Sequence, residues 1–156
     1  MELSSHQIEK IGEAYVAEKL YREGIKFARP DIDEGIDLIV YTDCVDEGFR
    51  ALPLQLKSFS GEEFFTDQKY LKIPDLYIVY LWNVGTELQT RAFGMPYSEA
   101  EKIVDDHGWS RKNGRYVRTR GTSTLHNALV PFEIKSWRSL FWDRKKHKGR
   151  CTRKSK

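Results

Sequence analysis

The sequence predicts one α/β domain with a central mixed β-sheet flanked by helices. The length of 156 residues allows one domain with a proper core, but not two ordinary ones. Apolar residues make up 40% of the chain and aromatic residues 13%, which is typical of folded rather than disordered proteins. Helical and strand-like patterns alternate along the chain without repeats, and this favours a mixed sheet covered by helices.

The first predicted element is a helix that begins near Ser4 and ends near Gly24. Ser4 and Gln7 match a capping box, and glycine commonly closes a helix. The apolar stripe of this helix contains Val16, Ala17 and Leu20. Glu13 lies in the middle of that stripe, where a carboxylate is unusual, so it is either functional or a structural residue that reaches solvent or pairs with Lys10.

Three strands are predicted next, at 25–28, 37–42 and 49–59. The second is apolar and β-branched, as expected of a buried strand, and 43–48 has the composition of a turn. In the third strand, one face holds Leu52, Leu54 and Leu56 and the other holds Pro53, Gln55 and Lys57. Pro53 also indicates an edge position or a strand start, because proline donates no hydrogen bond.

The middle of the chain is predicted to hold the central strand of the sheet. Residues 61–74 are expected to be irregular with some helix. The pattern at 75–83 is the strongest central-strand signal in the chain. Residues 88–96 also have a strand pattern and are expected to form a neighbouring strand. Ser98 with Glu101 then predicts a second capped helix.

A hairpin, a short helix and a basic tail are predicted for the last third of the chain. Asn113-Gly114 between strand formers is typical of a tight hairpin. The residues expected to dock a final helix are Trp137, Leu140 and Phe141. We therefore expect the domain to cover residues 1–143 and the tail to cover residues 144–156.

Charge is distributed unevenly along the chain. Residues 135–156 hold ten of the 26 lysines and arginines and one of the 23 acidic residues, so the rest holds 16 basic and 22 acidic residues. Such an end binds a polyanion, either nucleic acid or an anionic membrane, or is simply solvated. The candidate nucleic-acid contacts are Arg111, Lys112 and Arg115 in the hairpin and Arg144, Lys145 and Lys146 in the tail.

The sequence shows no sign of membrane insertion or secretion. No apolar run reaches the length of a membrane span, and the first residues lack the layout of a signal peptide. Cys44 and Cys151 lie far apart and are expected to be reduced thiols. These features predict a cytoplasmic protein without a membrane partner.

Four polar residues can form one metal site. Gln55 and Lys57 point to the same side of their strand, and a hairpin after 37–42 would place Asp37 beside them. With Glu13 they offer charged and neutral oxygens for Mg²⁺ and an ammonium group, which is what phosphodiester hydrolysis requires. Each residue also has a structural interpretation, since Gln55 and Lys57 can be the solvated face of an edge strand and Asp37 a turn cap.

These segments resemble the PD-(D/E)XK nuclease superfamily, in the variant where glutamine replaces the acidic member. The resemblance lies in "GE" at 12–13, "GIDLIV" at 35–40 and "LQLKS" at 54–58, and it covers about residues 8–82. In this layout the chain is similar to Mrr-like restriction enzymes, archaeal Holliday-junction resolvases and a small homing endonuclease.

The resemblance implies a restriction-endonuclease-like fold and a DNA endonuclease. It implies an Mg²⁺ site, for which Mn²⁺ can substitute, formed by Glu13, Asp37 and Gln55 with the backbone carbonyl of Leu56. Lys57 would be the catalytic lysine. An enzyme of this size meets two DNA strands most simply as a homodimer or a higher symmetric oligomer.

Two other functions remain open from the sequence. A non-catalytic DNA-binding module on the same fold is one, because a neutral glutamine binds a divalent cation less well than a carboxylate does. A membrane-surface protein that uses 136–150 as an amphipathic basic helix is the other. Pro30-Asp31 is expected to lie in a polar turn, with Asp33 and Glu34 as turn residues or secondary contributors.

Overall fold

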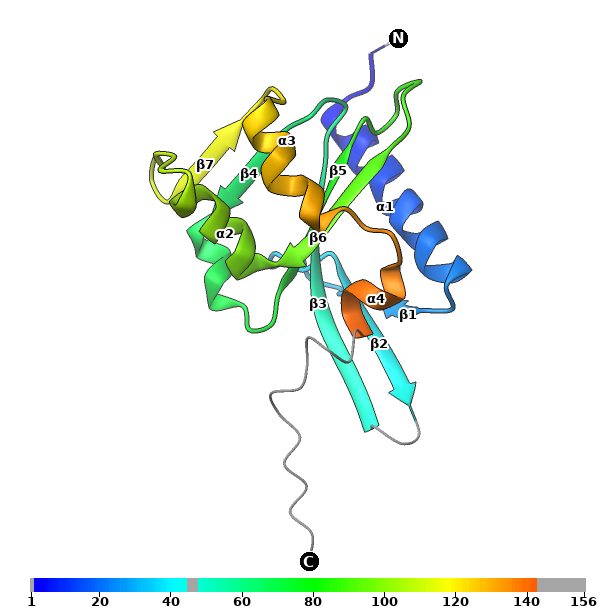
Figure 1. Ribbon diagram of the computed structural model, residues 1–156. Coiled ribbons are helices and arrows are strands. Elements are labelled where there is room, and N and C mark those ends of the chain that lie inside the picture. The colour runs from blue at the N-terminus through cyan, green and yellow to red at the C-terminus, as the bar shows by residue number, and fades with distance from the viewer. Residues whose placement is uncertain (1, 45–47, 143–156) are drawn as a thin grey trace, which may run out of the picture.

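A mixed five-stranded sheet forms the centre of the structure, with the strand order β1-β2-β3-β5-β6 (Figure 1). The computed structural model describes residues 2–44 and 48–142. The strands of this sheet are β1 (Lys26–Ala28), β2 (Leu38–Cys44), β3 (Gly48–Ser58), β5 (Tyr77–Trp82) and β6 (Arg91–Pro96). Only β3 and β5 are parallel; the other neighbours are antiparallel. The predicted α/β class with a mixed sheet is therefore confirmed.

A second sheet and four α-helices complete the described part of the fold. The second sheet pairs β4 (Phe64–Asp67) with β7 (Arg115–Arg118). The α-helices are α1 (Ser5–Arg22), α2 (Tyr97–Asp106), α3 (Ser123–Leu129) and α4 (Trp137–Trp142). Two 3₁₀-helices, η1 (Gln68–Lys72) and η2 (Val130–Phe132), connect these elements. Within the described ranges, none of the helices is long and apolar enough to cross a bilayer.

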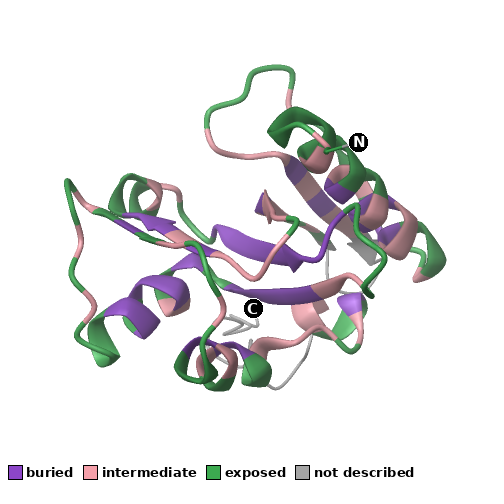
Figure 2. Ribbon diagram, turned by 90° about the horizontal axis from the view of Figure 1, so that it is seen from above, coloured by how far each residue is buried: buried purple, intermediate pink, exposed green. Residues whose placement is uncertain are grey.

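The two faces of the large sheet carry separate hydrophobic cores. One face packs against α1 and α4 through Val16, Leu20 and Phe141. The other face packs against α2, α3 and the small sheet, and its core includes Ile78 and Tyr80 of β5. Figure 2 shows the buried residues along the central strands and the inner sides of the helices.

The predicted start and end of α1 are confirmed. Ser4 accepts a hydrogen bond from the Gln7 backbone N–H, and the Gln7 side chain accepts one from the Ser4 N–H, so the capping box is complete. Gly24 follows the helix with φ of +66°, a left-handed conformation that glycine adopts without strain. The stripe of Val16, Ala17 and Leu20 is buried, as expected.

The hairpin of β2 and β3 explains the position of Pro53. The two strands pair from Cys44↔Gly48 to Leu38↔Leu54, with Pro53 opposite Ile39. The pairing of β3 with β5 begins only at Leu54↔Tyr77. In the described residues, the first half of β3 therefore has β2 as its only neighbour, and Pro53 sits on that open edge, as the sequence predicted.

Three local predictions differ from the structure. Residues 61–74, expected to be mostly irregular, contain β4 as well as η1. The second helix begins at Tyr97, and its N-cap is Pro96 without a side-chain hydrogen bond, so Ser98 does not cap it. The chain enters this helix directly from β6, which leaves no separate turn for a serine cap. Helix α3 was not anticipated, although Thr122 caps it by accepting from the Leu125 N–H.

The predicted hairpin around Asn113-Gly114 is only a turn. Both residues have positive φ, and Lys112 forms a single bridge with Arg115 across the turn. Residues 109–111 form no strand. β7 pairs instead with β4, and this pairing places Tyr116 in the second core beside Phe64. The predicted final helix is confirmed, with Trp137 and Phe141 of α4 buried.

Candidate active site

A large open cleft of about 1410 Å³ lies between α1, the loop before β2, the end of β3 and the segment β4–η1. Its lining includes Glu13, Asp37, Gln55, Leu56 and Lys57. The five residues that the sequence placed in one site therefore share one cleft. Asp31 does not line it and is exposed, whereas Asp33 and Glu34 contribute to its rim.

Asp37 is held at the end of the β2–β3 ladder. Its Oδ2 accepts hydrogen bonds from the Leu56 N–H at 2.6 Å and from Gln55 Nε2 at 2.7 Å. The ladder ends at Leu38↔Leu54, so no backbone carbonyl of β2 reaches the Leu56 N–H, and the carboxylate accepts it instead. Both bonds use Oδ2, which leaves Oδ1 for a further ligand.

Gln55 has the one buried oxygen in this group that lacks a partner. The residue is 4% exposed, and its Nε2 donates to Asp37 and, at 3.3 Å, to the Leu56 carbonyl. Its Oε1 is buried without a hydrogen bond. A buried carbonyl oxygen without a donor costs free energy, and a cation or a bound water would offset that cost.

The pKa of Asp37 is raised above the ordinary value. Burial is the largest cause, and the negative charges of Asp33 and Glu13 add to it. The hydrogen bond from the Leu56 N–H and the positive charge of Lys57 act in the opposite direction. The carboxylate is thus held in a position where its charge is unfavourable without a nearby cation.

Glu13 reaches the cleft from α1 and pairs with Lys10, as one of its two interpretations predicted. It lines the cleft, and it also accepts an ion pair from Lys10 at 3.0 Å. The preceding residue, Gly12, fixes the helix at this point, because a Cβ there would overlap the side chain of Ser58 on β3. The absence of a Cβ lets α1 approach the end of β3 closely, which places Glu13 near Asp37.

Lys57 is held by aromatic rings. Its Nζ lies 5.3 Å from the centroid of Phe65 and 5.8 Å from that of Tyr70, within the range of a cation–π contact. It faces the same side of the sheet as Gln55, since the two lie opposite Tyr80 and Ile78 of β5.

The donor set fits a hard cation that keeps several waters. Asp37, Glu13, the free carbonyl oxygen of Gln55 and the Leu56 carbonyl are all oxygen ligands, which Mg²⁺ and Mn²⁺ prefer. Within residues 2–44 and 48–142, no group of three His, Cys, Asp or Glu side chains is placed to hold a metal ion. Any cation in this cleft would therefore depend on the amide and backbone oxygens as well as on carboxylates.

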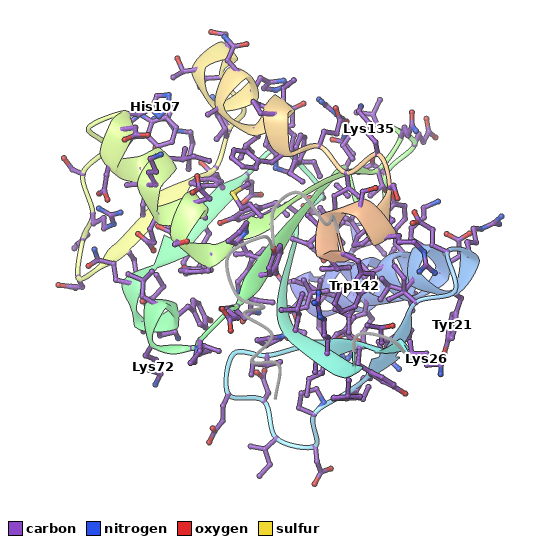
Figure 3. The ribbon with its side chains drawn as sticks, turned by 60° about the horizontal axis from the view of Figure 1, so that its bottom comes forward. Tyr21, Lys26, Lys72, His107, Lys135 and Trp142 are labelled. Atoms are coloured by element: carbon purple, nitrogen blue, oxygen red, sulfur yellow. The ribbon has the colours of Figure 1, made fainter. Side chains whose placement is uncertain are left out.

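The cleft as a whole is rich in acid. Its acidic residues are Glu2, Glu9, Glu13, Asp33, Glu34, Asp37 and Glu63, and its lysines are Lys10, Lys57, Lys69 and Lys72. Lys69 and Lys72 both come from η1. In Figure 3, Lys72 lies on the opposite side from Tyr21, which is near the end of α1. One wall is therefore basic and the wall formed by α1 mainly acidic.

The three predicted nucleic-acid contacts in the described residues, Arg111, Lys112 and Arg115, do not line this cleft. Arg111 makes salt bridges with Glu101 and Asp105, both at 2.6 Å. Arg115 pairs with Asp67 at 2.8 Å, and Lys112 is exposed at the turn. The remaining candidates, Arg144, Lys145 and Lys146, lie outside the described residues.

Phe65 and Tyr70 belong to the cleft, although nothing in the sequence predicts it. Both line the cleft and contact Lys57. They belong to a segment whose apolar pattern is too short to predict which strand it joins. Nothing in the sequence links them to Lys57, because the contact depends on β4 and η1 folding back over the sheet.

Comparison with known proteins does not assign the chain to a family. No family model matches it, and neither the curated proteins nor the solved structures that were compared with it gave a match. The function is therefore inferred from the site itself.

Proposed function

We propose that this protein is an Mg²⁺-dependent endonuclease that hydrolyses phosphodiester bonds in DNA. The observation that carries the proposal is the convergence of Asp37, Gln55 and Lys57 with Glu13 in one cleft. The resemblance of residues 8–82 to the PD-(D/E)XK superfamily adds support. The chemistry of this donor set agrees with both.

Four oxygens of the chain would hold the cation. They belong to the side chains of Glu13, Asp37 and Gln55 and to the backbone of Leu56. Glu13 would bind directly or through water after exchanging its contact with Lys10. When bound, Mg²⁺ polarises a phosphoryl oxygen and makes a bound water more acidic, and Mn²⁺ can supply the same chemistry.

Lys57 would act on the substrate through its ammonium group. Its three N–H donors can orient the attacking water or hydrogen-bond a non-bridging phosphate oxygen, where negative charge develops. Burial of Gln55 and Leu56 behind it restricts water at this end of the cleft. The charge of Lys57 is therefore more effective here than on an open surface.

The acidic wall requires positive charge from elsewhere before DNA can approach. A cation at Asp37 and the basic residues of 144–156 would supply it. We propose further that two copies act together, as a homodimer or a higher symmetric oligomer, so that both strands of a duplex can be cut. Light scattering of the purified protein measures this directly.

Plasmid nicking tests the catalytic proposal. Wild type with Mg²⁺ or Mn²⁺ is expected to nick or linearise a plasmid, and Asp37→Ala and Lys57→Ala are each expected to lower the rate by about 100-fold or more. Asp31→Ala is the matched control, since Asp31 lies in the same segment but is exposed and outside the cleft. Equal cutting by all four proteins, or cutting by none, would refute the proposal.

Binding assays separate the alternative function. A non-catalytic DNA-binding module would bind DNA equally well with Asp37→Ala or Lys57→Ala, would cut nothing, and would lose binding without residues 144–156. Flotation with anionic liposomes tests the membrane-surface alternative in the same preparation.

A further inference from the structure

The structure assigns a positioning role to Phe65 and Tyr70: their rings hold the Lys57 ammonium away from Asp37 and Glu13, so that carboxylates and lysine remain separately available. We infer this role on the basis of the function proposed above. The two rings come from β4 and η1, whereas the oxygen donors come from α1, β2 and β3. The lysine and the cation ligands are thus fixed by different parts of the fold.

An ammonium group this close to Asp37 needs something to keep it apart from the carboxylates of the cleft. Lys57 is near enough to Asp37 for its charge to lower the pKa of that carboxyl group, and Glu13 acts on the same carboxyl group. On a flexible four-carbon stem, such an ammonium would pair with the carboxylates and neutralise them. Its contacts in the structure are instead with Phe65 and Tyr70.

An aromatic ring is well suited to this task. It attracts a cation through its quadrupole but carries no charge and takes no full hydrogen bond. Lys57 therefore keeps its positive charge and its N–H donors for a phosphate oxygen or a water. A carboxylate partner would instead neutralise that charge and occupy those N–H donors.

The backbone of Phe65 and the ring of Tyr70 are each fixed by contacts with neighbouring elements. The Phe65 carbonyl accepts a hydrogen bond from the Tyr80 hydroxyl at 2.8 Å, and Tyr80 lies opposite Lys57 in the sheet. Tyr70 packs edge-on against Tyr97 at 5.5 Å between centroids. It also fills the space beside Gly35, where a Cβ would lie 2.6 Å from the ring.

The position of Gly35 makes Tyr70 a link between the two halves of the site. Gly35 has φ of +93° and lies two residues before Asp37, so the loop that delivers Asp37 rests on the ring that holds Lys57. Lys69 also lies over Tyr70, at 4.8 Å from the centroid, and pairs with Asp67 at 3.8 Å. The ring thus has a second cation on it that is held independently of the cleft carboxylates.

Proton NMR of the metal-free protein tests the position of Lys57 directly. Its ε-methylene protons are expected upfield of those of the exposed Lys135, because aromatic faces shield protons above them. Phe65→Leu and Tyr70→Leu are expected to move them back, and Tyr70→Phe, which keeps the ring, is expected to retain most of the shift. Lys57→Met assigns the signal. If the ε-methylene protons of Lys57 in wild type have the same chemical shift as those of Lys135, the inference is overturned, whether or not the protein binds Mg²⁺.

A double-mutant cycle on Mg²⁺ affinity tests the functional consequence. With Lys57 present, Phe65→Leu with Tyr70→Leu is expected to weaken Mg²⁺ binding by about three- to tenfold, because the released ammonium competes for the carboxylates. In a Lys57→Met background the same pair of substitutions is expected to weaken Mg²⁺ binding clearly less, because only the support that Tyr70 gives to the Asp37 loop is lost. Equal weakening in both backgrounds would show a merely structural role and contradict the inference.

The two proposals fail in different ways. If wild type binds no Mg²⁺ and cuts no DNA, the endonuclease proposal is refuted, and so is the role of the rings in keeping ligands available. If wild type binds Mg²⁺ and cuts, but the cycle shows no coupling between Lys57 and the rings, only the positioning role is refuted.

Discussion

Asp37 shows how a single residue can be unfavourable for folding and suited to binding. Its carboxylate is buried at the end of a strand, with its pKa raised mainly by burial and by the charges of Asp33 and Glu13. Beside it, Gln55 Oε1 is buried without a donor. Both features cost stability in the metal-free protein, and both would be relieved by a cation.

Asp37→Asn is expected to stabilise the metal-free protein at neutral pH. A neutral amide removes the buried charge, and its oxygen at the Oδ2 position can still accept from the Leu56 N–H and from Gln55 Nε2. At a pH below the ordinary aspartate value, Asp37 is neutral in the folded and unfolded states, so the advantage should vanish. The extra stability of Asp37→Asn over wild type should grow as pH rises through the raised pKa of Asp37 in the folded state.

Urea unfolding in EDTA at acid and neutral pH measures this difference. Adding Mg²⁺ should then stabilise wild type and leave Asp37→Asn unchanged, which reverses the order of the two proteins. A variant that is less stable than wild type at neutral pH in EDTA would contradict the expectation. Asp31→Asn serves as the control for loss of an exposed charge in the same segment.

The elements position these residues through a few close contacts. Helix α1 approaches β3 where Gly12 meets Ser58, and helix α4 is joined to the end of α1 by Glu23. The Glu23 carboxylate accepts from the N–H groups of Trp137 and Arg138, each at 2.8 Å, at the start of α4. These contacts fix α1 at two points along its length.

Gly12→Ala is expected to lower the free energy of unfolding by about 1–3 kcal/mol, because the added methyl group overlaps the Ser58 side chain and α1 must move. The shift should also weaken Mg²⁺ binding, since Glu13 moves with the helix. Adding Ser58→Gly should restore part of both. Gly61→Ala is the control, because the nearest atom to a Cβ there is 4.0 Å away. Similar losses in both alanine variants would exclude this explanation.

Glu23→Gln is expected to cost about 1 kcal/mol at neutral pH, the usual scale for losing a helix-capping acceptor of this kind. Burial raises the pKa of Glu23, but hydrogen bonds from Arg138, Trp137 and Ser136 lower it by more, so the net shift is downward. The stabilisation is therefore complete above the unfolded-state pKa and is lost as pH falls through the folded-state pKa. The unfolding temperatures of wild type and Glu23→Gln should therefore converge as the pH is lowered across this range. A difference in unfolding temperature that persists in acid would contradict the capping role of the Glu23 carboxylate.

At the scale of the whole molecule, charge divides between an acidic body and a basic end. The described cleft has more acids than lysines, while residues 144–156 carry eight of the 26 basic residues. An acidic body repels DNA, so affinity should depend on the basic end and on divalent cations.

Removing residues 144–156 is expected to reduce the salt dependence of DNA binding. Each phosphate contact contributes about 0.9 to the slope of log affinity against log salt, so the slope should fall by several units. Fluorescence anisotropy with a labelled duplex at four salt concentrations measures it. Lys112→Ala, which removes one exposed charge, should change the slope by one unit at most. An unchanged slope after truncation would show that the basic end makes no phosphate contacts.

The sequence predicted the large sheet well because its strands have strong local patterns. The buried β5 and the capping box of α1 depend on neighbouring residues alone. The grouping of Asp37 with Gln55 was also predictable, since a hairpin and strand alternation place them together. The pairing of β4 with β7 was not, because it joins segments some 50 residues apart in sequence, neither of which has a distinctive pattern. The role of Phe65 and Tyr70 in the site could not be predicted for the same reason, because it depends on this long-range contact.

Pro53 has a consequence for how the protein behaves at high concentration. The Leu54 carbonyl and the Leu56 N–H face β2, so by alternation the nitrogen of Pro53 faces the open edge of β3. An extended strand from another chain would find no donor at this position, which disfavours edge-to-edge pairing. Pro53→Thr should leave the fold intact and increase turbidity on concentration or heating, which ties solubility to one ring in the hairpin that also carries the candidate active site.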